Sequence, residues 1–138
     1  MGQQQLLLII LGVIIVGIAV AVGITMFQDN ALDQNRNMVI ADLSTLAAKA
    51  QQYYAKPVSL GGGGNSFVGL TNIGVLGIGM LASSPFADNP NGTYSIKTAG
   101  TATQVVLHGI GKMALSDGTF PTYDMTVTVQ SQTPTKIN

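Results

Sequence analysis

The order of apolar and polar positions divides the chain into an apolar run, an amphipathic stretch and a more polar remainder. Leu6–Phe27 (LLLIILGVIIVGIAVAVGITMF) is almost unbroken in apolar residues, and the first 28 residues carry no charged side chain. As a helix, this run would extend roughly 33 Å at ~1.5 Å per residue, enough to cross the hydrocarbon core of a bilayer. Such a span has to lie in lipid or be buried against copies of itself.

An amphipathic stretch follows the apolar run. In residues 28–56, apolar side chains recur at spacings of 7, 4, 3, 4 and 3, which is helical periodicity. No proline precedes Pro57, and the residue before a proline is disfavoured in a helix. The sequence therefore predicts one helix from about Gln3 to Ala55, roughly 80 Å long at the same rise. The stripe that would pack against the rest of the chain comprises Leu32, Val39, Leu43, Leu46, Ala50 and Tyr53.

The segment after the helix is rich in glycine. Gly61–Asn65 is predicted to be a flexible loop, and residues 67–83 fit either a short helix or a buried loop against the long helix. The cluster Asp88–Gly92 is a dense turn signal.

Three later stretches alternate as strands do: Thr93–Thr98, Thr103–Ile110 and Met125–Gln130. Their expected inward residues are Tyr94, Ile96, Val105, Leu107, Met125, Val127 and Val129. The pattern predicts an α+β fold in which a small antiparallel sheet packs on the distal half of the long helix. The expected domains are an apolar helix that spans the membrane or packs against copies of itself (1–27), its amphipathic continuation (28–56) and a β-rich head (57–138).

Composition removes several functional classes from consideration. Net charge is zero and no basic stripe is present, so nucleic-acid binding has no electrostatic support. The absence of cysteine excludes disulfides and thiolate metal sites. Met1–Gln5 lacks the basic residues of a secretory signal, and Leu6 stands where a myristoylation motif needs Ser or Thr. We therefore expect the apolar span to be retained in the working protein.

The apolar run leading without a break into NRNMVIADLSTLAAKAQQYYAK resembles the N-terminal half of type IV pilins. The resemblance covers the whole architecture and is specific in the first 55 residues. The chain departs from the family pattern at Gln5, where pilins usually have glutamate, and in beginning Met1-Gly2-Gln3 rather than with a methylated phenylalanine after a basic leader. On this pattern, Met1 is the candidate for N-terminal processing and methylation.

The resemblance implies a subunit held in the inner membrane and then transferred into an extracellular helical filament. Its implied partners are copies of itself, a membrane assembly platform, a cytoplasmic assembly ATPase and a prepilin peptidase. Adhesion, motility and DNA uptake are the roles associated with such filaments. Residues expected to pack in the filament core are Leu6, Leu7, Ile10, Gly12, Val13, Gly17, Ala19, Ala21, Gly23 and Phe27.

Polar and small residues of the first helix offer two further hypotheses. Gly17/Ala21 and Ala19/Gly23 are small-x-x-x-small pairs that permit close helix approach, although single-span helices also contain such pairs by chance. Gln3, Gln4 and Gln5 either accept a hydrogen bond from a neighbouring subunit's terminal amine or form a polar cap at the membrane–water boundary. Replacing Gln5 by Leu distinguishes these roles.

Three other groups of polar residues could form a metal or catalytic site, but each is also explained by an ordinary position on the surface. His108 has no cysteine or carboxylate cluster beside it and is expected on the strand surface rather than in a zinc site or triad. Asp117 and Asp124 are expected to be solvated loop acids rather than a catalytic pair. Asp88, Asn89 and Asn91 could offer oxygens to a calcium ion, but their spacing matches too short a part of the twelve-residue calcium-binding loop.

Other motifs are equally unspecific. Gly64-Asn65-Ser66 lacks the lysine of a phosphate loop, and the exposed turn alone explains the glycosylation-like Asn91-Gly92-Thr93. Phe27, Tyr53 and Tyr54 are expected to serve in packing rather than in conduction. We expect no cofactor and no enzymatic activity. The alternatives to a filament subunit are a pseudopilin of a secretion system and a monomeric membrane-anchored surface domain that binds a ligand.

Overall fold

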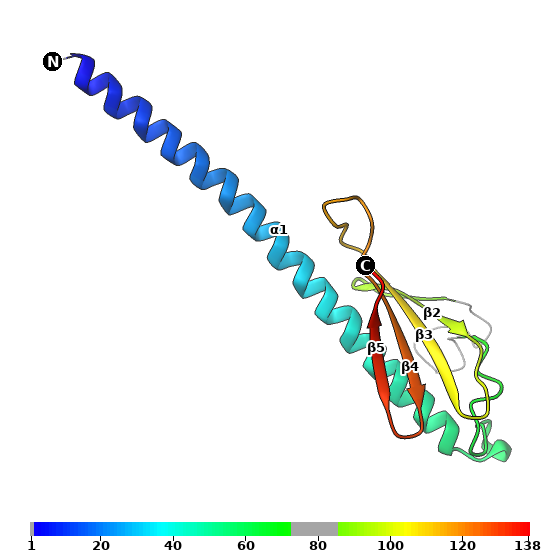
Figure 1. Ribbon diagram of the computed structural model, residues 1–138. Helices are drawn as coiled ribbons and strands as arrows, with labels where there is room; N and C mark the ends of the chain where they lie inside the picture. The colour runs from blue at the N-terminus through cyan, green and yellow to red at the C-terminus, as the bar shows by residue number, and fades with distance from the viewer. Residues whose placement is uncertain (1, 73–85) are drawn as a thin grey trace. The chain divides into compact units, whose positions relative to one another are not determined.

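The long helix predicted from the sequence is present and continuous. In the computed structural model, which describes residues 2–72 and 86–138, helix α1 spans Gly2–Ala55 (Figure 1). Its first residue lies one position before the predicted start, and its last residue is the predicted one. Met1 and the part of the glycine–aliphatic segment at 73–83 lie outside the described residues.

The chain divides into two compact units, and the boundary falls inside α1. The first comprises Met1–Asp33 and the second Gln34–Asn138; we call them the N-terminal unit and the sheet unit. Each has its own pattern of burial. In the N-terminal unit the side chains of residues 2–30 are exposed apart from Gly23, whereas in the sheet unit α1 contributes five fully buried residues: Val39, Leu43, Leu46, Ala47 and Ala50.

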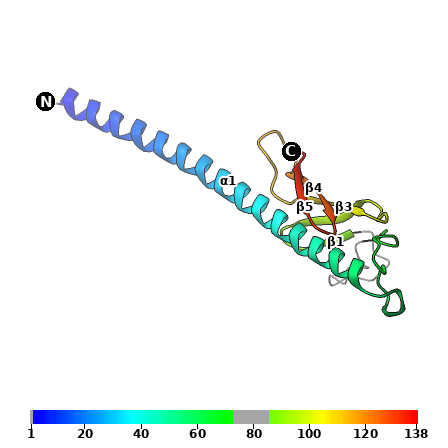
Figure 2. The same ribbon diagram turned by 60° about the horizontal axis from the view of Figure 1, so that its bottom comes forward.

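In its described residues, the sheet unit contains one five-stranded sheet whose strands follow in chain order. Every neighbouring pair is antiparallel (Figures 1 and 2). The strands are β1 (Phe86–Asp88), β2 (Gly92–Thr98), β3 (Gln104–Gly111), β4 (Thr122–Thr128) and β5 (Gln132–Lys136), and a 3-10 turn, η1 (Val58–Leu60), follows the helix. The antiparallel sheet packed on the distal half of the helix is confirmed.

Two details of the strand prediction are wrong. The last predicted strand, Met125–Gln130, corresponds to β4, which starts three residues earlier and ends at Thr128. Met125 and Val127 face the core as expected, but Val129 is 48% exposed and Tyr123 takes the third inward position. The edge strands β1 and β5 are additional to the three predicted ones.

Helix α1 lies directly against the inner face of the sheet. Tyr94, Val105, Leu107, Met125 and Val127 from the strands form one cluster with the buried residues of the helix, and Phe67 and Leu70 from the intervening loop complete it. A Cβ atom at Gly109 would lie 3.1 Å from Leu43 Cδ1. Glycine at this position in β3 therefore lets the helix approach the strand backbone closely.

The two ends of the sheet are distinguished by the loops that connect the strands there and by the helix residue that bonds to each end. At one end, residues 112–121 connect β3 to β4, and Asn35 donates a side-chain hydrogen bond to the Asn91 carbonyl over 2.8 Å. At the other end, residues 129–131 connect β4 to β5, and Gln51 donates to the Thr128 carbonyl over 2.9 Å. We call these the loop end and the hairpin end. Asn35 and Gln51 are about 24 Å apart along α1 at ~1.5 Å per residue.

The glycine-rich segment after α1 is an ordered cap rather than the flexible loop predicted. Its amide groups donate to carbonyls at the end of the helix and in the following turn: Gly63 to Tyr53, Gly64 to Lys56, and Asn65 to Tyr54. The last carbonyls of a helix otherwise lack backbone partners. A Cβ at Gly63 would lie 1.8 Å from the Ser66 carbonyl oxygen, so this fold of the loop excludes any larger side chain there.

Candidate functional site

The N-terminal unit exposes a continuous apolar surface. Its side chains between Leu6 and Phe27 are largely uncovered in the single chain, with Phe27 80% exposed. One 18-residue window of α1 has a mean hydropathy of 3.2, which makes this helix a candidate membrane span by length and composition. All ten residues predicted to pack in a filament core lie in this unit on α1.

Gln3, Gln4 and Gln5 form the first turn of α1 and are exposed. They make no hydrogen bond through their side chains within the described part of the chain. Their amide groups are therefore available to solvent, to lipid headgroups or to another molecule.

The predicted stripe of the amphipathic half occupies a range of environments. Val39, Leu43, Leu46 and Ala50 are buried in the core of the sheet unit. Tyr53 is partly buried, and its hydroxyl donates to the Val68 carbonyl over 3.1 Å. The first residue of the predicted stripe, Leu32, is half-buried and belongs to the N-terminal unit.

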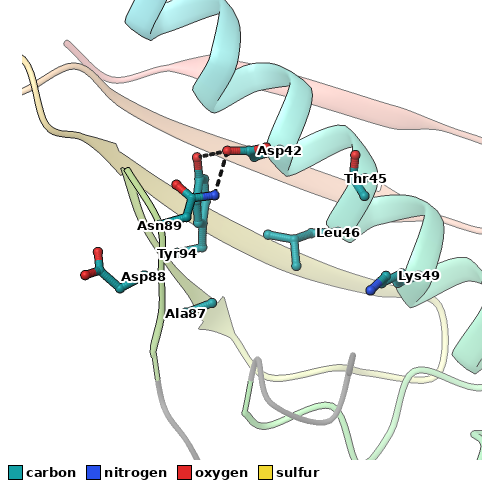
Figure 3. A pocket seen from close by; sticks show the side chains of 8 residues that line it. All are labelled: Asp42, Thr45, Leu46, Lys49, Ala87, Asp88, Asn89 and Tyr94. Atoms are coloured by element: carbon teal, nitrogen blue, oxygen red, sulfur yellow. Dashed lines mark hydrogen bonds between the residues drawn. The ribbon is translucent and has the colours of Figure 1, made fainter. Parts of the chain in front are cut away.

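A polar cluster centred on Asp42 fastens α1 to the strands. Tyr94 donates its hydroxyl hydrogen to Asp42 Oδ2 over 2.6 Å, and the side-chain amides of Asn89 and Asn91 donate to the same oxygen over 2.9 and 3.1 Å. Burial alone raises the pKa of the Asp42 carboxyl, but these hydrogen bonds outweigh it and the pKa lies below its ordinary value. Figure 3 shows Tyr94 and Asn89 directed at Asp42, whereas Asp88 points away.

Other contacts engage two of the side-chain oxygens considered for calcium, one on Asp88 and one on Asn89. Asn89 Oδ1 accepts hydrogen bonds from the backbone amides of Asn91 and Gly92, both over 2.9 Å. Asp88 Oδ1 lies 2.7 Å from the Lys112 ammonium. The turn is therefore held by hydrogen bonds of its own and by contacts with Asp42 and Lys112. No group of three or more His, Cys, Asp or Glu side chains suited to a metal ion occurs in residues 2–72 and 86–138.

A small hollow lies beside the Asp42 cluster. It holds about 110 Å³ and is lined by side chains of α1, β1 and β2, among them Leu46, Lys49 and Ala87 (Figure 3). Small-molecule sites typically occupy about 300–1,000 Å³. The hollow is too small for such a ligand in this conformation.

A second polar cluster lies on the outer face of the sheet around Asp124. His108 Nδ1 is 2.5 Å from Asp124 Oδ1, and the Lys97 ammonium is paired with Asp124 Oδ2. Lys97 is the extra residue at the irregularity between Ile96 and Thr98 in the β2–β3 register. One carboxylate therefore joins three neighbouring strands, β2, β3 and β4.

The Asp124 cluster corrects two expectations from the sequence. Asp124 is a strand residue only 8% exposed, not a solvated loop acid, and it is the oriented acid beside His108 that the sequence gave no reason to expect. Asp117 does lie in the exposed β3–β4 connection, as expected. Burial raises the pKa of the Asp124 carboxyl, but the hydrogen bonds from Lys97 and His108 outweigh it, and the pKa lies below its ordinary value.

The strand register also places Ser95 opposite His108, so a serine, a histidine and an aspartate lie in a row across β2, β3 and β4. A catalytic triad needs a hydrogen bond between the nucleophile and the base. Ser95 makes no side-chain hydrogen bond to His108 or to any other described residue. The His108–Asp124 contact therefore serves to connect strands in this arrangement.

Sequence reasoning missed the partners of both clusters. Asp42 does not belong to the apolar stripe predicted for the helix, and its hydrogen-bond donors are residues 47 to 52 positions later in the chain. The signal that marks Asp124 is its position between Tyr123 and Met125, two residues that alternate with it toward the core. Alternation carried three residues further toward the N-terminus would have placed Asp124 within the strand, on the face opposite Tyr123 and Met125.

The chain matches no protein-family model, no curated protein and no solved structure. Its likeness to pilins is therefore one of architecture: a long N-terminal helix, apolar in its first half, and an antiparallel sheet.

Proposed function

We propose that the chain is a structural subunit of a type IV pilus-like extracellular filament that polymerises through its apolar N-terminal helix. The observation that carries this proposal is Leu6–Phe27, a helical segment apolar on all sides and uncovered in the single chain. A helix of this kind is stable only when lipid or other protein surrounds it. In the membrane, lipid surrounds the segment; in a filament, the same segments of neighbouring copies do.

The glycines of the apolar segment favour a role between chains. A Cβ atom added at Gly12, Gly17 or Gly23 would meet nothing within 4 Å among residues 2–72 and 86–138, so no packing within this part of the chain requires glycine there. Each glycine costs about 1 kcal/mol of helix propensity relative to alanine. Because lipid tails are as apolar as leucine, association of such helices depends on close packing at small residues. Close approach of neighbouring helices accounts for glycines that the single chain does not need.

This function implies a sequence of locations and partners. The subunit is held in the inner membrane by α1 before assembly and is then part of a surface filament. An assembly platform, an ATPase and a prepilin peptidase that processes the N-terminus would act on it. Contact with surfaces, motility and uptake are roles open to such a filament.

The first test is electron microscopy of material sheared from the cell surface, with helical reconstruction of any filament whose subunit mass is 14.3 kDa. We expect a filament with residues 3–27 bundled at its centre. Protein that stays in the membrane fraction, with no filament, would overturn the proposal and favour a pseudopilin or an anchored binding domain. These two are separated by deleting residues 1–27, which leaves ligand binding intact only in the anchored domain.

A matched pair of variants tests whether the apolar segment drives assembly. Ile14→Asp places a charge in the middle of the segment, where insertion costs about 2.5–3.5 kcal/mol. We expect this variant to abolish filaments. Met38→Asp introduces the same charge at an exposed position of α1 in the sheet unit and is expected to retain filaments. Equal filament yield from both variants would contradict the proposal.

Gln5 defines the chemistry at the start of the bundle. An amide brings no net charge into an apolar core, unlike the glutamate usual in pilins, and it can still accept a hydrogen bond from a neighbour's amine. Loss of filaments in Gln5→Leu would support a hydrogen bond from the neighbour's amine to Gln5. Unchanged assembly would instead support a role for the three glutamines as a polar cap at the membrane–water boundary.

A further inference from the structure

The loop end of the sheet unit exposes four large apolar side chains, which we call the loop-end patch. Phe120 and Met113 lie in the β3–β4 connection, which extends beyond the strands in Figure 1, and they are 45% and 38% exposed. Ile137, which follows β5, is 50% exposed, and Ile110 of β3 is 36% exposed. Apolar surface of this kind is favoured in contact with an apolar environment rather than with water.

The sheet holds the two isoleucines of the patch close to the same residue. Ile110 pairs with Thr122 in the β3–β4 register. The backbone amide of Ile137 donates to the Thr122 carbonyl over 2.9 Å. Both isoleucines are therefore fixed at the start of β4.

The other two residues of the patch are fixed next to α1. The Met113 amide donates to Asn35 Oδ1 over 3.4 Å. The amide of Gly111 donates over 2.8 Å to the carbonyl of Pro121, the residue that follows Phe120. A Cβ atom at Gly111 would lie 2.3 Å from Asn35 Oδ1, so this backbone approaches the helix closely. Asn35 is thus the point at which α1 holds the patch.

Asn35 also lies near the apolar run of α1 in the sequence. It follows Phe27, the last residue of that run, by eight positions. Eight residues of α-helix rise about 12 Å, and even a fully extended chain of eight residues spans no more than about 28 Å. When the apolar run lies in a bilayer, the patch is therefore held near the surface of that bilayer.

Charge does not select a partner for the patch. The Lys112 ammonium lies 2.7 Å from Asp88 Oδ1. The charged residues of the loop end, together with those on either side of Asn35, are equal in number for the two signs: Arg36, Lys112 and Lys136 against Asp33, Asp88 and Asp117. Any binding by this surface therefore depends on its apolar side chains.

The small size of the patch favours lipid over a second copy of the chain. Four partly exposed side chains form it, whereas a stable protein–protein interface involves about 20–30 residues on each side. A bilayer that already holds α1 makes a smaller demand, because a tethered surface is present at high effective concentration and the contact costs little further entropy.

We propose that, before assembly, the loop-end patch rests in the interfacial region of the bilayer that holds α1, with Phe120 and Ile137 in contact with lipid. This inference rests on the part of the proposed function that places α1 in a membrane. Removal of a subunit from the membrane then requires release of the patch as well as transfer of the apolar run.

The absence of native tryptophan allows one introduced tryptophan to report on this contact. The full-length variant Phe120→Trp is reconstituted into phosphatidylcholine vesicles that contain lipids with a nitroxide quencher. Val129→Trp is the matched control, because Val129 is exposed to a similar extent (48%) but lies at the hairpin end. Ile14→Trp reports whether the apolar run is inserted. We expect Phe120→Trp to emit at shorter wavelength than Val129→Trp and to be quenched several-fold more strongly.

The outcomes separate this inference from the proposed function. Quenching in Ile14→Trp but not in Phe120→Trp would overturn the lipid contact and leave the filament function standing. Short-wavelength emission from Phe120→Trp without quenching by lipid would also overturn it, and would indicate that a second copy covers the patch. Equal quenching in Val129→Trp would show non-specific proximity and overturn the contact.

Two further outcomes concern the proposed function itself. No quenching in Ile14→Trp would overturn both the lipid contact and the membrane-held stage of the proposed function. Quenching in Ile14→Trp and Phe120→Trp, with no filament in the microscopy of sheared material, would support the contact and overturn the filament function.

A second substitution separates binding by the patch from mere tethering by α1. Ile137→Asp, introduced into Phe120→Trp, places a charge in the patch at a half-exposed position after β5, where folding does not depend on the side chain. We expect it to lower the quenching several-fold. Leu60→Asp in the same background changes a residue 66% exposed at the hairpin end and is expected to leave quenching unchanged. Unchanged quenching in Ile137→Asp would overturn the proposal, because the tether alone would then account for the signal.

Discussion

Tyr94 of β2 donates a 2.6 Å hydrogen bond to Asp42 of α1, across the junction of helix and sheet. Burial is the main reason that the pKa of the Tyr94 phenol is raised, and the negative charge of Asp42 raises it further. The Asp42 pKa is lowered by the same contact. The proton therefore stays on the phenol and the charge on the carboxylate throughout the neutral range.

Tyr94→Phe is expected to destabilise the sheet unit by about 1.5–3 kcal/mol, the usual contribution of a hydrogen bond to a charged group. The aromatic ring is retained in this variant, so the loss of unfolding free energy measures the contribution of the hydroxyl group. The measurement is denaturant unfolding of the full chain in detergent, followed by tyrosine circular dichroism. All four tyrosines lie in the sheet unit and the chain has no tryptophan, so the signal is local.

Tyr54→Phe is the matched control for this prediction. Tyr54 packs against Phe67 with ring centroids 4.8 Å apart, and its hydroxyl makes no hydrogen bond within residues 2–72 and 86–138. We expect a change within about 0.5 kcal/mol. An equal loss in both variants would show that the Asp42 contact contributes nothing measurable.

Acid is expected to weaken the sheet unit through Asp124. Because its pKa is lower in the folded chain than the ordinary value of about 3.9, the unfolded chain binds more protons between the two values. The stabilisation from Asp124 is therefore complete above about pH 4 and is lost as the pH falls through the folded pKa. The measurement is the free energy of unfolding between pH 2 and pH 7.

Asp124→Asn is expected to cost about 1–3 kcal/mol at neutral pH, because Lys97 and His108 lose their charged partner. Below pH 4, the free energy of unfolding of this variant should approach that of the unsubstituted chain. Asp29→Asn serves as the control, since Asp29 has no hydrogen bond or ion pair in the described residues. A constant difference between Asp124→Asn and the unsubstituted chain down to pH 2 would contradict this assignment.

Gly63→Ala is expected to lower stability by at least about 2 kcal/mol. The new Cβ would lie 1.8 Å from the Ser66 carbonyl oxygen and 2.9 Å from Tyr53 Cε1, so the cap on α1 would have to open. Gly17→Ala, where the added atom meets nothing, leaves the sheet unit unchanged in the same unfolding experiment. Tolerance of alanine at position 63 would mean that the cap contributes little to the fold.

Leu43→Ala tests the contact between the helix and β3. Leu43 is fully buried against Gly109, and truncation of such a leucine costs about 2–5 kcal/mol through lost burial and the cavity left behind. Leu60→Ala, at a residue 66% exposed, is the matched control and should change stability by no more than about 0.5 kcal/mol. If both substitutions cost the same, the core does not lie where the structure places it.

The helix was predictable because its signals are local and agree. Apolar spacing identifies the buried face around Leu43, and Pro57 fixes the end at Ala55. The inward residues of β2 and β3 followed from alternation for the same reason. Pilin-like architecture was therefore accessible from the order of residues alone.

The missed features depend on partners distant in the chain. Strand β5 has no apolar alternation, contains Pro134 and is mostly exposed, so only its pairing with β4 makes it a strand. Asp42 and Asp124 each obtain their donors from other elements. The glycine-rich loop looked flexible because its order comes from hydrogen bonds to helix carbonyls, which its own composition does not reveal.

The proline in β5 has a consequence for the material properties of any polymer this chain forms. Pro134 has no N–H group to offer an added strand, and edge prolines oppose the continuation of a sheet from one molecule to the next. At the β5 edge, copies in such a polymer would be joined by side chains or helices rather than by a shared backbone ladder. Aligned fibres should accordingly lack the ~4.7 Å meridional reflection of cross-β structure and should dissolve in detergents that leave amyloid intact.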